Sequence, residues 1–178
     1  MNQLANIAAA AKSYGTPFLL GGGHAVITHG FARSTFDLDL IVRETDREKW
    51  LQLARSAGYE LLQDNPNFLQ FNAVDKATFP LDLMFVNDGT FAKMDAAAVP
   101  SPSGPAGLRV VSLMHLLALK CHAVKFGHPG RIVKDAEDVI HLMRRNGLDP
   151  NAEQIRELFR KHGTDEFYEK VRRASAPS

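Results

Sequence analysis

Apolar residues follow two spacings along this 178-residue chain, and each spacing predicts a different kind of element. Short apolar or alternating runs bounded by Gly, Pro or Asn predict strands at 17–20, 36–42, 59–63, 67–73, 81–86 and 108–111. Apolar residues at helical spacing predict helices at 3–14, 24–30, 46–57, 112–126, 132–146, 151–162 and 164–173. Because strands and helices follow in mixed order, we expect an α/β (α+β) fold with a mixed central sheet flanked by helices.

The segment 100–105, Pro-Ser-Pro-Ser-Gly-Pro, divides the sequence into two parts of different character. We expect residues 1–100 to form the α/β core. Residues 101–178 then comprise a linker and a C-terminal helical part packed on that core, together one compact unit.

Composition narrows the class of protein without identifying it. The chain is 45% hydrophobic and 23% charged, which excludes global disorder. Lys plus Arg total 21 against 20 for Asp plus Glu, so no overall field favours nucleic acid or membrane. A single cysteine, Cys121, precludes an intrachain disulfide. With no apolar run long enough to span a bilayer, we expect a cytoplasmic protein with no membrane partner.

Three aspartates on predicted strands are the first candidate chemistry. Asp37 and Asp39 are two residues apart and therefore project from one face of their strand, and Asp82 lies between Leu81 and Leu83 on another strand. Carboxylates close together repel, and a hard divalent cation such as Mg²⁺ relieves that repulsion. A lone Asp-x-Asp is nevertheless more often a solvated strand edge, so both interpretations stay open on this pattern alone.

A glycine triplet, Gly21-Gly22-Gly23, follows a predicted strand and opens a predicted helix. Such a turn brings backbone amides close to a phosphate, at the positive end of a helix. No Gly-Lys-Ser/Thr follows for a Walker loop, and Val26 stands where a dinucleotide fingerprint needs its third glycine. Taken alone, the triplet is equally compatible with a plain tight turn.

Taken together, Leu20-Gly21-Gly22-Gly23 and the run Arg33-Ser34-Thr35-Phe36-Asp37-Leu38-Asp39-Leu40 closely resemble the signature of the polymerase-β-like nucleotidyltransferase superfamily. Thirteen residues separate Gly23 from Asp37, and Asp82 stands where the superfamily places its third carboxylate. The resemblance implies that Asp37, Asp39 and Asp82 are the metal ligands and catalytic residues. In that scheme Asp82 also accepts the proton of the attacking hydroxyl.

The same resemblance implies a nucleotide-binding set. Gly22 and Gly23 would offer backbone contacts to the phosphates, and Arg33, next to Ser34, would neutralise phosphate charge. The alternative for Arg33 is a solvated loop arginine. The superfamily's phosphate-binding serine is absent here, replaced by glycine and then His24, which itself could touch the substrate.

Downstream, the sequence is most similar to the AbiEii-type (abortive infection, toxin) nucleotidyltransferases. Lys120-Cys121-His122-Ala123 resembles their Lys-x-x-Ala element, and residues 131–138 resemble their Arg/Lys-Asp-x-x-Asp helix. Lys120 is then a candidate triphosphate ligand, or else a lysine that packs its stem on the helix edge and extends to solvent. Asp135 would pair with a neighbouring basic residue or orient Lys120, and Asp138 would be structural.

The resemblance implies a Mg²⁺-dependent enzyme, with two ions, that moves a nucleoside monophosphate from an NTP such as ATP to a hydroxyl. The acceptor would be a tRNA, a protein or a small hydroxylated molecule, and the enzyme the toxin of a toxin–antitoxin pair with an antitoxin partner. The alternative is a non-catalytic nucleotide- or RNA-binding domain that retains the fold. Residues 120–145 hold six Lys/Arg against three Asp/Glu, but no aromatic cluster for stacking bases is evident there.

Overall fold

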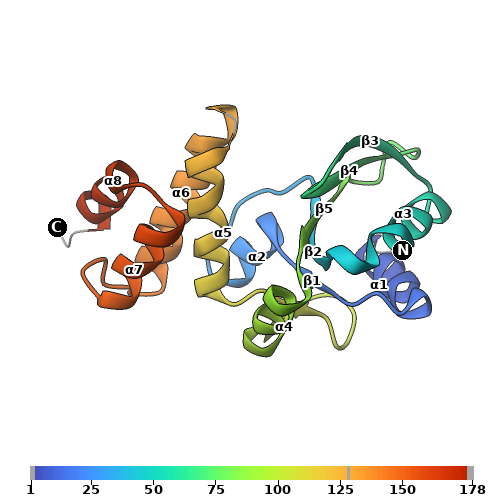
Figure 1. Cartoon of the computed structure of the whole chain (residues 1–178), viewed down its shortest axis with the longest axis horizontal. Coiled ribbons are helices and arrows are strands. Elements are labelled where there is room, and N and C mark those ends of the chain that lie inside the picture. The colour runs from blue at the N-terminus through green and yellow to red at the C-terminus, as the bar shows by residue number, and fades with distance from the viewer. Residues whose placement is uncertain (1–2, 128, 176–178) are drawn as a thin grey trace. The chain divides into compact units, whose positions relative to one another are not determined.

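The computed structural model describes residues 3–127 and 129–175, without the side chains of 129–131. Its α-helices are α1 Gln3–Tyr14, α2 Gly22–Thr28, α3 Arg47–Ser56, α4 Asp88–Ala97, α5 Leu113–Phe126, α6 Pro129–Arg145, α7 Glu153–His162 and α8 Asp165–Ser175 (Figure 1). A 3-10 turn, η1, covers Glu44–Asp46. The strands are β1 Phe18–Leu20, β2 Leu38–Arg43, β3 Tyr59–Asn65, β4 Phe68–Ala73, β5 Leu81–Val86, β6 Val99–Pro100 and β7 Arg109–Val110. None of the described helices is long and apolar enough to cross a membrane.

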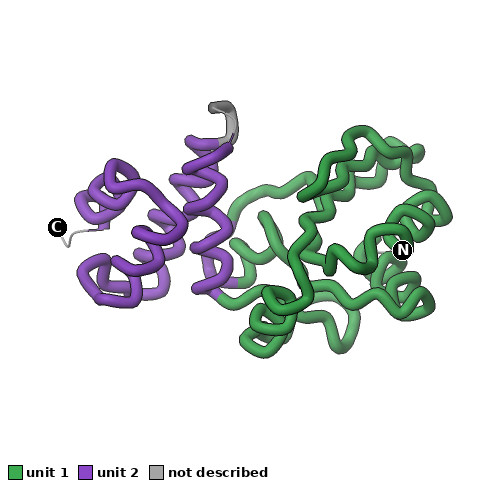
Figure 2. The backbone as a smooth tube through the Cα atoms, viewed as in Figure 1, with its two compact units in different colours: residues 1–28, 33–112 green, residues 29–32, 113–178 purple. Residues whose placement is uncertain are grey.

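The chain forms two compact units, one of residues 1–28 and 33–112 and the other of residues 29–32 and 113–178 (Figure 2). The first unit holds a seven-stranded sheet in the order β3-β4-β5-β2-β1-β7-β6. Its β2–β5 and β1–β7 pairs are parallel and the others antiparallel, which confirms the expected mixed sheet.

The sheet is apolar on the face that α3 covers. Leu38, Leu40 and Val42 of β2 are at most 2% exposed, and Trp50 of α3 packs edge-to-face on Phe18 with ring centroids 6.0 Å apart. Burying such side chains contributes roughly 1.5–3 kcal/mol each. The alternate residues of the strand consequently project from the other face, and Asp39 is among them.

The segment 100–105 begins with the last residue of β6, Pro100, and continues into the loop that leads to β7; these two short strands pair antiparallel inside the first unit. Apart from residues 29–32, which belong to the second unit, the chain passes from the first unit to the second between residues 112 and 113, directly before α5.

The second unit is helical. Helix α5 packs on α6 and α7, and α8 packs on α6 and α7. Its core contains the buried side chains Leu116, Leu117, Cys121, Val139, Leu142, Ile155, Phe159, Phe167 and Val171. Residues 29–32 join this unit because Phe31 stacks on His141 at 4.1 Å and the His29 carbonyl accepts a hydrogen bond from Asn146.

Three details correct the expectations from sequence. Helix α4 was missed, because Asn87-Asp88-Gly89 looks like a turn, whereas the Asn87 side chain caps the helix by accepting the Thr90 N–H at 2.8 Å. Strand β2 begins at Leu38, so Asp37 precedes the strand. The helix predicted at 46–57 begins at Arg47: Asp46 is its N-cap residue, but the Asp46 carboxylate makes no capping bond and pairs with Arg43 and Lys49 instead.

Candidate active site

Two of the three predicted aspartates are direct neighbours on adjacent strands. Strands β2 and β5 run parallel, and their register places Asp39 opposite Asp82. Leu38 and Leu40 on one strand, and Leu81 and Leu83 on the other, are buried on the opposite face. Because parallel strands lie about 4.8 Å apart, the two carboxylates share one partly exposed region of the sheet.

The glycine turn lies directly against this region. Gly22 has φ +49°, a left-handed conformation that glycine adopts without a Cβ penalty. The Asp39 carboxylate occupies the space that a Cβ on Gly22 would need. The Gly21 N–H also donates to the Asp39 carbonyl at 2.9 Å. The glycine triplet therefore does more than connect β1 to α2, because the missing side chain of Gly22 leaves the space in which the Asp39 carboxylate lies.

The loop before β2 brings the rest of the predicted set to the same turn. A Cβ on Gly23 would collide with the Thr35 hydroxyl and lie 3.1 Å from Nη1 of Arg33. Thr35 in turn donates its hydroxyl hydrogen to Oδ1 of Asp37 at 2.7 Å. Ser34 is exposed, and its carbonyl accepts a bond from Arg33 at 3.0 Å.

Gln70, which the sequence analysis did not single out, belongs to this group. It stands opposite Asp82 in the antiparallel β4–β5 pair, and its Nε2 donates to Oδ2 of Asp82 at 3.2 Å. Thr35 was likewise missed as a partner of Asp37. Both are neutral donors to a carboxylate, and such bonds orient an acid without neutralising its charge.

His24, at the start of α2, lies close to both Asp37 and Arg33. Burial lowers the pKa of His24 below its usual value of 6.5, Asp37 acts against that shift, and Arg33 adds to it. The imidazole is therefore neutral at neutral pH and can accept or donate a hydrogen bond without carrying charge.

The donor set of Asp37, Asp39 and Asp82 consists of carboxylate oxygens, which suit a hard divalent cation such as Mg²⁺. The space beside the bare α-carbon of Gly22 is filled by the Asp39 carboxylate itself. Within the residues that the structure describes, however, no three acidic, histidine or cysteine side chains are gathered closely enough to hold an ion. The carboxylate oxygens are therefore of the kind that binds Mg²⁺, but the three side chains are not close enough together to coordinate one ion.

Lys120, the remaining predicted nucleotide-binding residue, lies in the helical unit. Its Nζ is 2.6 Å from Asp135 and 2.7 Å from Asp138, and all three side chains are at most 9% exposed. Of the alternatives drawn from sequence, a lysine extending to solvent is wrong, and Asp135 does pair with Lys120. The side chain of Arg131, part of the same motif, lies outside the described residues.

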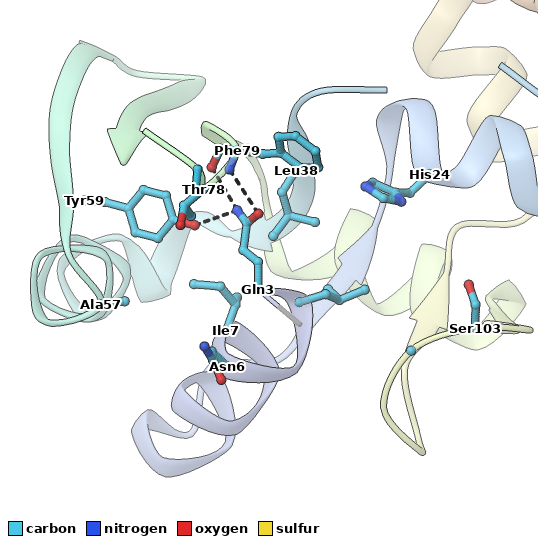
Figure 3. Close-up of a pocket in the computed structure, with 13 residues that line it drawn as sticks. Gln3, Asn6, Ile7, His24, Leu38, Ala57, Tyr59, Thr78, Phe79 and Ser103 are labelled. Atoms are coloured by element: carbon cyan, nitrogen blue, oxygen red, sulfur yellow. Dashed lines mark hydrogen bonds between the residues drawn. The ribbon is translucent and has the colours of Figure 1, made fainter. Parts of the chain in front are cut away.

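A pocket of about 440 Å³ opens elsewhere in the first unit (Figure 3). Gln3 of α1 reaches across it, donating to the Tyr59 hydroxyl at 2.6 Å and to the Phe79 carbonyl at 2.8 Å. The three aspartates are not part of its lining, although His24 is. Since Gln3 joins α1 to the sheet through these bonds, the pocket marks a structural junction.

A glycine turn placed against acids on a mixed sheet is what the sequence resemblance led us to expect of a nucleotidyltransferase, and comparison with known proteins shows that class. The family described as "Nucleotidyl transferase AbiEii toxin, Type IV TA system" matches residues 6–177. The chain belongs to this AbiEii nucleotidyltransferase toxin family. Among curated proteins, none matches the chain significantly in sequence.

Solved structures share the fold at low identity. ANT(2″)-Ia in complex with adenylyl-2″-tobramycin is 18% identical, with a TM-score of 0.61 over 96% of this chain and 95% of that one. The lincosamide antibiotic adenylyltransferase LnuA, lincomycin-bound, is 16% identical, with a TM-score of 0.51 over 79% and 94%. A nucleotidyltransferase-like protein from Paracoccidioides brasiliensis is 13% identical, with a TM-score of 0.52 over 98% and 92%. These likenesses confirm the nucleotidyltransferase fold.

Proposed function

We propose that this nucleotidyltransferase moves a nucleoside monophosphate from an NTP to a hydroxyl group in a Mg²⁺-dependent reaction. The observation that carries the proposal is the contact between the Asp39 carboxylate and the bare α-carbon of Gly22, in register with Asp82. A phosphate-binding turn and a metal-binding acid then act on the same phosphate groups.

Each residue has a distinct role in this proposal. Asp37, Asp39 and Asp82 would hold the metal ions, which would supply positive charge to neutralise the triphosphate. Asp82 also accepts the proton of the attacking hydroxyl. Gly22 and Gly23 offer backbone amides to the β- and γ-phosphates, and Arg33 offers its guanidinium to the same charges.

Lys120 has a different place in this proposal from the one predicted. The Lys120 ammonium is buried between the carboxylates of Asp135 and Asp138, which are also buried. In this proposal Lys120 is a structural residue of the helical unit and not a ligand of the triphosphate.

The test is incubation of the protein with each α-labelled NTP and Mg²⁺, with bulk tRNA, protein or hydroxylated antibiotics as acceptors. We expect one acceptor to become labelled while pyrophosphate is released. Asp39→Asn should reduce labelling by at least 100-fold, whereas Asp75→Asn, which alters an exposed loop acid, should leave it intact. Full labelling by Asp39→Asn, or in excess chelator, would overturn the proposed role of Asp39 and of Mg²⁺. If the wild-type chain binds an NTP but labels no acceptor, the non-catalytic nucleotide-binding domain is favoured instead.

The family also bears the name of a toxin, and we propose that this activity arrests growth. Expression of the wild-type chain alone should slow growth, and a neighbouring antitoxin gene should restore it. Expression of Asp39→Asn should have no effect on growth. If both proteins arrest growth equally, the toxicity does not depend on nucleotide transfer.

A further inference from the structure

Basic side chains, two lysines and three histidines, lie on two helices of the second unit that pack on each other. Helix α5 contains no Asp or Glu, and it carries His115, His122 and Lys125 at intervals that place them along one side. Helix α7, which packs on α5, ends in Lys161 and His162.

The pKa of His162 reflects the proximity of these basic groups. Burial lowers the pKa of His162, and the remaining causes are all cationic or titratable to a cation: Lys161, His122, Lys125 and His115. We call these five residues and Phe126 the α5–α7 surface. Lys125 and Lys161 carry charge at neutral pH, whereas burial lowers the pKa values of His115 and His162 below 6.5, so these imidazoles are neutral hydrogen-bonding groups. Two lysines beside such groups favour a polyanion as the partner of this surface.

The balance of charge over the unit agrees with this. Residues 29–32 and 113–178 contain twelve Lys/Arg and nine Asp/Glu, a net charge of +3, while the rest of the chain contains nine and eleven, a net charge of −2. The buried cluster of Lys120, Asp135 and Asp138 accounts for −1 of the unit's charge. The remaining residues of the unit therefore carry +4.

Phe126 adds an aromatic face to these basic side chains. Phe126 is 68% exposed, so much of its ring is accessible to a ligand. The His122 ring lies 4.7 Å from it, and Nζ of Lys125 lies 5.3 Å from its centroid. Phe126 is the one Phe, Tyr or Trp between residues 120 and 145, and its ring lies beside the His122 imidazole and the Lys125 ammonium.

We propose that the α5–α7 surface binds a single-stranded nucleic acid. Lys125 and Lys161 contact its phosphates, and a base stacks on Phe126. An acidic peptide would use the cations but leave the exposed ring without a planar partner, so the pair of features favours nucleic acid. That this strand is also the acceptor of the nucleotide rests on the proposed function, whereas the binding itself does not.

Binding is tested by fluorescence anisotropy with a labelled 12-nucleotide oligo(rA), using Asp39→Asn so that no transfer occurs. We expect binding that weakens linearly in log[salt]. Removing both lysines, Lys125→Ala with Lys161→Ala, should lower the slope by about 1.4, because each phosphate contact on a single strand contributes about 0.7. Phe126→Ala should weaken binding by about 5- to 100-fold, and Phe126→Trp should preserve it.

Two control variants alter comparable positions in the first unit. Lys76→Ala removes an exposed lysine and Leu62→Ala an apolar residue that is 63% exposed, and both should bind like the parent. Labelled oligo(dA) and a labelled poly-Glu peptide identify the kind of partner. If oligo(dA) binds as tightly as oligo(rA), the proposal of a single-stranded nucleic acid stands. If the peptide binds as tightly as oligo(rA), the proposal is overturned.

Other outcomes separate this proposal from the proposed function. No binding of oligo(rA) at 50 mM salt, or binding unchanged by Phe126→Ala and by the double lysine variant, overturns the nucleic-acid surface. If the RNA binds while no acceptor takes up label, the proposed function fails and the surface stands. If an antibiotic is labelled and RNA does not bind, the surface fails and the proposed function stands.

Discussion

At the scale of single residues, Gly22 and Asp39 depend on each other. Gly22→Ala places a methyl group where the Asp39 carboxylate lies, in a backbone conformation with φ +49°. We expect a loss of about 1 kcal/mol in the free energy of unfolding from the left-handed backbone, and displacement of the carboxylate as well. Transfer activity should consequently fall by at least tenfold.

Gly58→Ala is the matched control, because Gly58 has φ +82° and no atom within 4 Å of an added Cβ. It should lose similar stability in urea unfolding and keep its transfer activity. Equal activity losses in both variants would show that backbone strain, and not the collision with Asp39, is responsible.

Gln70 offers a second prediction at this scale. Gln70→Leu removes the hydrogen bond to Asp82, and bonds to a charged group contribute about 1.5–3 kcal/mol. We therefore expect kcat/KM to fall by about 10- to 100-fold, with a higher Mg²⁺ requirement and an acid limb of the pH–rate profile shifted upward.

The control for Gln70 is Gln63→Leu, since Gln63 is exposed and stands opposite Gln70 across the β3–β4 pair. Its Mg²⁺ requirement and pH profile should match the wild type. If the pH profile of Gln70→Leu is unchanged, Gln70 has a structural role and does not act on the Asp82 carboxylate.

At the scale of elements, the spacing of hydrophobic residues predicted nearly every helix and strand. It did not predict which strands are neighbours in the sheet. Alternation showed which face Asp39 and Asp82 occupy, but their register depends on β2 and β5 being neighbours, which the sequence order does not reveal. Gln70 was invisible for the same reason. Helix α4 was missed because the signals of a turn, Asn87 and Gly89, are also those of a capped helix start.

Helices α5 and α6 are joined by the buried cluster around Lys120, and this predicts a large effect on stability. Lys120→Met leaves Asp135 and Asp138 buried without their cation, which costs about 3–5 kcal/mol in the free energy of unfolding. Lys125→Met, on the exposed side of the same helix, should change it by less than about 0.5 kcal/mol.

Adding Asp135→Asn and Asp138→Leu to Lys120→Met should restore much of the lost stability, because no unpaired charge is then buried. Urea unfolding of the three variants measures these differences. A Lys120→Met protein with wild-type stability and a raised KM for the NTP would return Lys120 to the nucleotide site.

At the scale of the whole molecule, three partly buried histidines link stability to pH. Burial is the largest cause that lowers the pKa values of His24, His115 and His162 below 6.5. The unfolded chain therefore binds more protons than the folded one just below pH 6.5, so stability is full above that value and falls as pH drops through the folded pKa values. We expect the urea midpoint to decrease from pH 7.5 to 5.5.

The histidines lie in different units, His24 in the first and the other two in the second, so the pH dependence can be divided between them. His24→Gln should flatten the pH dependence of a signal from Trp50, which is buried in the first unit. The double variant His115→Gln and His162→Gln should flatten the helical signal of the second unit instead. If both signals keep their wild-type slope in all variants, groups other than these histidines cause the loss of stability. If one variant flattens both signals, the two units unfold as a single cooperative structure.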